Sequence, residues 1–335
     1  MQRYLFHQIR LPAYGMILVL ILAGCAPEAE KPLEEVNYRL KWLYNISVVG
    51  DLYALDSGLF EKQGLTVNVK PGGPEKDAIK ELELGHAQFG VASADQVIRA
   101  VSKGSPIVVI AQLFQINPLH WIFRPDKTPL TTPQDLKGLT IGITHGGNDE
   151  TIMRALLAKY GILESDVNLF SVRYDYTPFY QGKVDLWPLY RNAQAPIIGA
   201  KLQKAGERFD LMDPSRLGIR LVANSVVTTR KMLEERRETV EKFIEALLQG
   251  WQEALDPANT DKAIDLVLKY NKETPEEIVR QQLAATRVLM MPSANFEFGT
   301  IDTAAWQQTE DIMLAQKLIP VRVYVEKLLK PIKEW

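Results

Sequence analysis

The chain has 335 residues, of which 46% are hydrophobic and 24% are charged, and its formal net charge is −2. At roughly 100–200 residues per domain, this length predicts two domains with enough chain to bury a core. A near-neutral charge without a run of Lys or Arg excludes the basic stripe of nucleic-acid binders. One cysteine and four scattered histidines argue against a disulfide framework or a Cys- or His-rich metal site, and we expect no cofactor.

The first 24 residues have the pattern of a secretory signal. Arg3 and Arg10 precede the uncharged segment 11–24, which is too short for a spanning helix of about 20 apolar residues. The segment ends in Leu-Ala-Gly before Cys25, which resembles a bacterial lipobox, in which the cysteine is lipidated and becomes the first mature residue. The alternative is an ordinary signal peptide with an incidental cysteine.

The polar segment that follows predicts where the folded part begins and lies. Residues 25–35 contain two prolines and read as a lipid-anchored tether, so the fold is expected from Val36 onward. Several acyl chains on Cys25 would anchor the protein stably to the cell membrane. We therefore predict an extracytoplasmic location, at the periplasmic face in a Gram-negative cell, where enzymes that need ATP or NAD are poor candidates.

Strands and helices alternate through the first part of the mature chain. The patterns predict strands at 38–43, 65–69, 89–92 and 106–112, and helices at 47–57, 77–84 and 94–102. Such alternation implies βαβ units and a parallel sheet.

A second unit of similar plan follows the Pro-rich seam at 124–129. Strands are expected at 139–143, 167–172 and 184–186, and helices at 149–160, 178–181 and 193–205. An apolar strand at 221–228 follows this unit. Amphipathic patterns then predict helices at 230–254, 260–270, 275–289, 303–316 and 321–329. Two α/β lobes with a cleft between them are the usual setting for a small ligand.

The order and spacing of five segments carry a family resemblance. They are Leu40–Trp42, Asp56–Leu65, Pro71–Pro74, Gly85–Ala92 and Asp135–Gly138. Together they resemble the periplasmic substrate-binding proteins of ABC importers, in the branch related to thiamine-pyrimidine synthases, over nearly all the mature chain.

The resemblance implies a two-lobed periplasmic binding protein fold of type II. Each lobe would have a parallel-rich sheet flanked by helices, and the two would be joined by two crossover strands, expected at Trp121–Phe123 and Leu221–Val226. The first lobe would comprise 36–122 and 223–335, and the second 123–222. The implied partners are a small solute and an ABC permease in the membrane, and the protein would be a monomer.

An enzymatic branch of this superfamily is excluded by the residues. Fungal synthases that build the thiamine pyrimidine carry a Lys and a His just after the strand that corresponds to Phe89–Val91. The corresponding positions here are Ala92 and Gln96, and the Cys-rich cluster of those enzymes is absent from the sequence.

In the first lobe, residues that follow strands are candidates for the cleft, because ligands bind beyond the carboxyl ends of strands. Trp42 would stack on a planar ligand and Asn45 would hydrogen-bond to it, although Trp42 could instead fill the core. Ser93 either holds a polar ligand group or is a simple helix cap. Gln112 and Phe114 would line the cleft wall, with core packing as the alternative for Phe114.

The second lobe offers candidates of the same kind. Asn148 and Glu150 lie where a strand gives way to a helix, and the acids in that turn favour a neutral or amine-bearing solute over an anion. Trp187 and Tyr190 are predicted to form an aromatic clamp with Trp42, the alternative being packing within the lobe. The remaining candidates for ligand contact are Tyr174, Asp175 and Asn192. Relatives often carry Asn-Glu where this chain has Asn192-Ala193, so Asp175 or Glu150 would have to replace that Glu.

These features favour a lipid-anchored receptor that captures a small heteroaromatic solute by lobe closure. A thiamine-type pyrimidine precursor is preferred and riboflavin is the main alternative. An alkanesulfonate, taurine or nitrate comes third, because Lys and Arg are sparse in the expected cleft loops. A sensory ligand-binding partner is less favoured. An extracytoplasmic enzyme is also less favoured, since no nucleophile elbow or zinc-protease motif is present.

Overall fold

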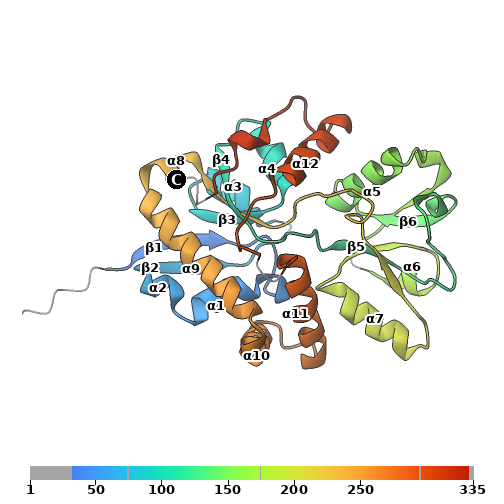
Figure 1. The fold of residues 1–335 in the computed structure, drawn as a ribbon, viewed down its shortest axis with the longest axis horizontal. Helices are drawn as coiled ribbons and strands as arrows, with labels where there is room; N and C mark the ends of the chain where they lie inside the picture. Colours follow the sequence, from blue (N-terminus) through green and yellow to red (C-terminus); the bar gives the residue numbers. More distant parts are fainter. Residues whose placement is uncertain (1–31, 74, 174, 294–295, 332–335) are drawn as a thin grey trace, which may run out of the picture. The chain divides into compact units, whose positions relative to one another are not determined.

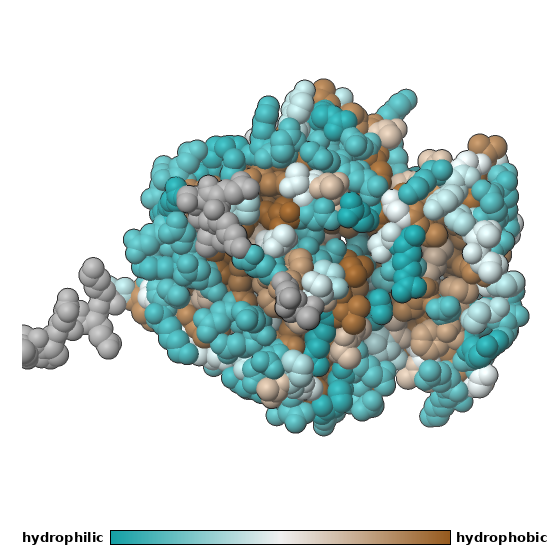
Figure 2. All heavy atoms as spheres, viewed as in Figure 1, coloured by the Kyte–Doolittle hydropathy of each residue, from teal (hydrophilic) through white to brown (hydrophobic). Residues whose placement is uncertain are grey.

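The computed structural model describes residues 32–73, 75–173, 175–293 and 296–331. Residues Leu33–Trp335 form one compact unit. The predicted signal sequence, Cys25 and most of the predicted tether lie outside the described residues. Among the residues described, no helix has the length and apolar character needed to cross a membrane. Figure 2 shows hydrophilic residues over much of one face, with hydrophobic ones gathered toward its middle.

A mixed five-stranded sheet is the centre of the larger part of this unit. Its strands are, in order, β2 (Leu65–Lys70), β1 (Glu34–Arg39), β3 (Phe89–Ala92), β10 (Ser225–Thr229) and β4 (Ile107–Gln112). β1 runs parallel to β2 and β3, whereas β10 runs antiparallel to β3 and β4. Every residue of β3 and β4 is buried, as expected for strands with both faces of the sheet covered.

Helices cover both faces of this sheet (Figure 1). On one face lie α1 (Val49–Asp56), α2 (Leu59–Lys62), α9 (Arg237–Leu255), α10 (Thr260–Tyr270) and α11 (Glu276–Met290). On the other lie α3 (Ala78–Glu83), α4 (Ala94–Val101) and α12 (Thr303–Ala315). The remaining elements of this part are α8 (Arg230–Glu235) and the 3-10 turns η1 (Ile46–Val48), η4 (Pro257–Asn259) and η5 (Val325–Lys327).

Close packing joins α9 to the sheet and to α1. The rings of Phe89 and Phe243 stack with centroids 3.7 Å apart. Gly50 lies against Trp251, where an added Cβ would approach the indole to 2.1 Å. The C-terminal helices therefore return to the sheet built by the N-terminal half, as the family resemblance implies.

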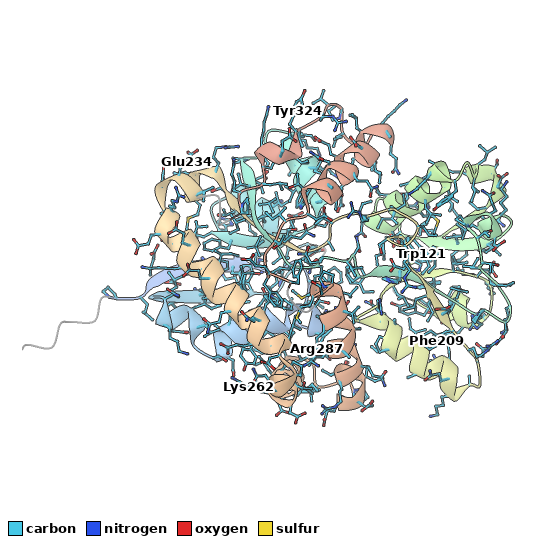
Figure 3. The ribbon with its side chains drawn as sticks, viewed as in Figure 1. Trp121, Phe209, Glu234, Lys262, Arg287 and Tyr324 are labelled. Atoms are coloured by element: carbon cyan, nitrogen blue, oxygen red, sulfur yellow. The ribbon has the colours of Figure 1, made fainter. Side chains whose placement is uncertain are left out.

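The middle of the chain forms smaller sheets of its own. β8 (Trp187–Tyr190), β5 (Leu119–Phe123) and β9 (Asp210–Met212) form an antiparallel three-stranded sheet, and β6 (Thr140–Ile143) pairs in parallel with β7 (Asn168–Ser171). The accompanying helices are α5 (Asn148–Lys159), α6 (Thr177–Tyr180) and α7 (Gln194–Lys204), with turns η2 (Pro133–Leu136) and η3 (Glu164–Asp166). Trp121, labelled in Figure 3, donates its indole N–H to Gly142 O at 3.0 Å and so ties β5 to β6.

The chain passes between the two groups of sheets at 113–118 and 213–224. These connections run together: Leu113 N–H donates to Asn224 O at 3.0 Å, and Asn117 Nδ2 donates to Leu221 O at 2.9 Å. The predicted positions of the crossovers, 121–123 and 221–226, are therefore wrong. Residues 121–123 belong to β5, and the second prediction extends into β10, because sheet pairing decides where each strand ends.

Four further expectations need correction. β1 begins at Glu34, inside the predicted tether, because its pairing with β2 starts at the Glu34–Leu65 pair. A strand lies at 187–190 instead of 184–186, since residues 187–190 pair with β5. The predicted helix 321–329 is only the turn η5, because Tyr324 adopts a left-handed backbone with φ of 60°. The five-stranded sheet is mixed and the three-stranded sheet is antiparallel, so neither is parallel-rich. The exact division into lobes stays a prediction.

Candidate functional site

A cavity of about 150 Å³ lies at the carboxyl ends of β1 and β3. Nine of the described residues line it, and all nine lie from position 41 to position 96. They are Lys41, Trp42, Gly73, Lys76, Asp77, Ala78, Val91, Ala92 and Gln96. This is the end of the sheet at which ligands of α/β proteins bind.

The loop after β1 is held against the loop after β2. Arg39 donates to Pro71 O at 2.7 Å and pairs with Glu81 at 2.9 Å. Gly72 N–H donates to Trp42 O at 2.9 Å, and a Cβ at Gly72 would lie 2.1 Å from Leu40 O. Only glycine allows this close approach, which sets the backbone of Trp42 while its side chain remains 37% exposed.

The turn after β3 forms a helix cap that also orients a lining residue. Ser93 N–H and Ser93 Oγ donate to Gln96 Oε1 at 3.1 and 3.0 Å, which makes the reciprocal contact of a capping box. Because a backbone N–H can only donate, it identifies the Gln96 atom beside it as the oxygen. The Gln96 amide NH₂ is thus the group left for a ligand, and the buried Ser93 acts as a cap.

The charged residues among the described lining sum to a formal charge of +1. Lys41 and Lys76 contribute two ammonium groups and Asp77 one carboxylate. Asp77 Oδ1 also caps α3, where it accepts from Ile79 N–H at 2.7 Å and Lys80 N–H at 3.2 Å. The positive character of this cavity contrasts with the sparse Lys and Arg expected for the cleft.

Of the first-lobe candidates, only Trp42 lines the cavity. Asn45 caps η1 by accepting from Ser47 N–H at 2.8 Å. Gln112 is buried, and its side-chain amide donates to Phe114 O and accepts from Asp302 N–H, each at 3.1 Å. Phe114 is 1% exposed and packs edge-on against Trp251, so the core alternative holds for this ring.

The predicted clamp of Trp42 with Trp187 is wrong for this structure. Trp187 is 1% exposed and packs with Tyr176 and Phe179, at ring distances of 5.4 and 6.4 Å. Because β8 pairs along β5, this ring enters the core of the second group of sheets instead of a cleft loop. Tyr190 is half-buried against the neighbouring core, and its N–H donates to Gln194 Oε1.

The turn into α5 carries acidic side chains, and their hydrogen bonds and ion pairs are made within the turn and the helix that follows. Asn148 begins the helix, and Glu150 accepts from Gly146 N–H at 2.7 Å and pairs with Arg154 at 2.9 Å. Partial burial acts to raise the pKa of Glu150, but these donors outweigh burial and hold that pKa below its usual value. Burial raises the pKa of Asp149. This turn does not line the cavity.

The remaining candidates lie in separate places. Asp175 is exposed, and hydrogen bonds from the Thr177 side chain and from Thr177 N–H, the latter at 2.9 Å, lower the pKa of its carboxyl group. Tyr174 lies outside the described residues. Asn192 is fully buried and donates to Ser47 Oγ and Thr286 Oγ1, each at 3.1 Å.

Sequence reasoning missed most of the residues that line the cavity. Lys41 was adjacent to a chosen residue, and the Ser-x-x-Gln spacing of Ser93 and Gln96 signalled the capping box. Nothing in the sequence pointed to Lys76 or Asp77, whose positions depend on how the loop after β2 folds back. Within the described part of the chain, no cluster of three or more His, Cys, Asp or Glu residues is arranged to hold a metal ion.

The fold is that of the periplasmic binding proteins. The crystal structure of the aliphatic sulphonate-binding protein SsuA from Escherichia coli matches with a TM-score of 0.69 and 19% identity, over 89% of this chain and 92% of that one. Residues 45–260 match the NMT1/THI5-like family, and the chain belongs to that family. This membership confirms the branch that the five segments indicated.

Two curated relatives align along nearly their whole length. The riboflavin-binding protein RibY of Chloroflexus aurantiacus is 24% identical, over 96% of this chain and 96% of the relative. The formylaminopyrimidine-binding protein of Halalkalibacterium halodurans is also 24% identical, over 88% and 89%.

Proposed function

We propose that this protein is a lipid-anchored receptor that captures a small heteroaromatic solute outside the cytoplasm and delivers it to an ABC permease. The observation that carries the proposal is the cavity beside Trp42, at the ligand-binding end of the sheet in a periplasmic binding protein fold. A substituted aromatic ring would stack on the indole while the cavity's polar groups bind its edge.

The size of the cavity favours a single-ring solute. Its volume of about 150 Å³ is below the roughly 300–1,000 Å³ of pockets for drug-sized ligands. A thiamine-type pyrimidine precursor therefore suits it better than riboflavin, whose three fused rings would need a wider opening. The formylaminopyrimidine-binding relative supports this preference, and the riboflavin-binding relative keeps riboflavin as the second candidate.

Binding without catalysis is supported by the relatives, two of which are named as binding proteins, since the fold alone does not decide between binding and catalysis. Lobe closure, rather than a chemical step, would hold the solute until the protein reaches its permease.

The experiment is a native mass spectrum and a fluorescence titration with thiamine pyrimidines, riboflavin, taurine and nitrate. The proposal expects a one-to-one adduct with a pyrimidine, and loss of most of the affinity in Trp42→Ala. Leu43→Ala is the matched control, because this neighbouring side chain is 56% exposed and does not line the cavity. No adduct with the whole panel, or unchanged affinity in Trp42→Ala, would overturn the proposed site.

The anchor is tested separately. Metabolic labelling with a radioactive fatty acid should mark the wild-type protein and leave Cys25→Ser unlabelled. Equal labelling of both proteins, or of neither, would contradict lipidation at Cys25.

A further inference from the structure

We infer that the solute carries an anionic oxygen group and that Lys41 and Lys76 bind it. The inference rests on the proposed function and narrows the class of solute for the same cavity. It departs from the sequence-based expectation of a neutral or amine-bearing solute, which depended on the acidic turn into α5.

The two lysines come from different loops and meet at one cavity. Lys41 follows β1, and Lys76 precedes α3, on the loop that closes over the end of β1. Within the part of the chain that the structure describes, neither ammonium group has an ion-pair partner among the protein's carboxylates. Two cations without an ion-pair partner at one small cavity favour an anion, because opposite charges attract.

The other polar groups of the cavity reinforce this preference. The Gln96 oxygen is occupied by Ser93, which leaves two amide N–H donors. Among the described lining residues, the one carboxylate is that of Asp77, whose Oδ1 accepts from the first turn of α3. On α3, the carboxylate of Glu81 is already held by Arg39 at 2.9 Å. The cavity is therefore rich in donors and poor in acceptors.

An aromatic wall beside such a donor set selects a solute with both features. Trp42 provides the apolar surface, while the lysines and the Gln96 amide suit the oxygens of a carboxylate or a phosphate ester. A heteroaromatic acid or a phosphorylated heteroaromatic alcohol would satisfy every one of these groups. A neutral pyrimidine would leave the ammonium groups without a counter-charge.

The test compares two probes that share one ring. Protein purified from membranes in detergent is titrated calorimetrically with 4-amino-5-hydroxymethyl-2-methylpyrimidine and with its monophosphate. We expect the monophosphate to bind about tenfold more tightly at low salt. That preference should shrink as salt rises from about 50 mM to about 500 mM, because the ions screen the exposed charges.

Three variants assign the preference to the lysines. Lys41→Gln and Lys76→Gln should each reduce the preference severalfold and leave the affinity for the neutral probe nearly unchanged. Lys80→Gln is the matched control, because Lys80 is an exposed residue of α3 that does not line the cavity.

The outcomes separate this inference from the proposed function. If the neutral pyrimidine binds as tightly as the monophosphate, or if the lysine variants weaken both probes equally, the inference is overturned and the receptor function stands. If neither probe binds, the result contradicts both the proposed pyrimidine solute and this inference.

Discussion

Asn192 and Ser47 are 145 residues apart in the chain, and the Asn192 side-chain amide donates to Ser47 Oγ at 3.1 Å. The same amide donates to Thr286 Oγ1, also at 3.1 Å. Thr286 gives its own hydroxyl hydrogen to Gln282 O, so its oxygen can only accept from Asn192. Gln282 in turn donates to Ala193 O at 2.7 Å. This buried network joins the segment after β8 to η1 and α11.

Removal of this amide should loosen the contact between the two groups of sheets. Asn192→Ala leaves the Ser47 and Thr286 hydroxyl oxygens without their donor, which costs roughly 1–3 kcal/mol in the free energy of unfolding. Backbone amides of 187–194 and of η1 should exchange hydrogen faster, as mass spectrometry can measure. Lys204→Ala, an exposed change on α7, is the control. Unchanged exchange in both segments would show that the network does not hold them together.

The two tryptophans first expected to face each other should respond in opposite ways. Trp187→Ala removes a fully buried ring and should lower the free energy of unfolding by about 3–5 kcal/mol. Trp42→Ala removes a partly exposed ring and should change stability by no more than about 1 kcal/mol. Urea unfolding followed by circular dichroism measures both values. Similar losses in the free energy of unfolding for the two variants would contradict the burial of Trp187 and the partial exposure of Trp42.

Asp51 predicts a dependence of stability on pH. This carboxyl group is buried beneath β1 and accepts a hydrogen bond from the Tyr38 hydroxyl. Burial raises its pKa from 3.8 to about 7, an effect that the Tyr38 hydrogen bond only partly offsets. The folded state therefore holds a proton that the unfolded state has lost between pH 4 and 7. Stability from this group is fully present below pH 4 and is lost as pH rises to about 7.

Asp51→Asn should remove that loss, because the amide cannot ionise and its oxygen still accepts from Tyr38. At one pKa unit per 1.36 kcal/mol, the variant should gain up to roughly 4 kcal/mol over wild type between pH 4 and 8. Urea unfolding at several pH values measures the difference. Asp56→Asn, at a more exposed carboxylate paired with Lys269, is the control. Parallel pH profiles for wild type and Asp51→Asn would refute the assignment.

Gly72 should prove essential for the shape of the cavity. In Gly72→Ala the new methyl group would meet Leu40 O at 2.1 Å and Lys41 C at 2.4 Å, so the loop after β1 must move. Because those atoms are backbone and cannot rotate away, we expect solute affinity to fall at least about tenfold with a stability loss of roughly 1–3 kcal/mol. Gly85→Ala is the comparison, because its φ of 72° strains alanine in a turn outside the cavity. A variant of Gly72 with normal affinity would show that the loops are not held as described.

Local pattern determined much of the architecture. Alternating strands and helices predicted most elements of the five-stranded sheet, because hydrophobic periodicity acts over a few residues. The order of short segments such as Leu40–Trp42 and Gly85–Ala92 was enough to indicate the family that residues 45–260 confirm. The family resemblance favoured Trp42 as a pocket residue, and Trp42 lines the cavity at the carboxyl end of β1.

Only the tertiary structure decided which side chains meet. Trp187 looked like a loop residue until its pairing with β5 carried the ring into a core. Lys76 joined Lys41 at one cavity because the loop after β2 folds against Trp42 through the Gly72 hydrogen bond. Asn192 was chosen as a ligand contact, and the structure engages its amide with Ser47 and Thr286. Such contacts join residues far apart in sequence, and a pattern that extends over a few neighbours carries no information about them.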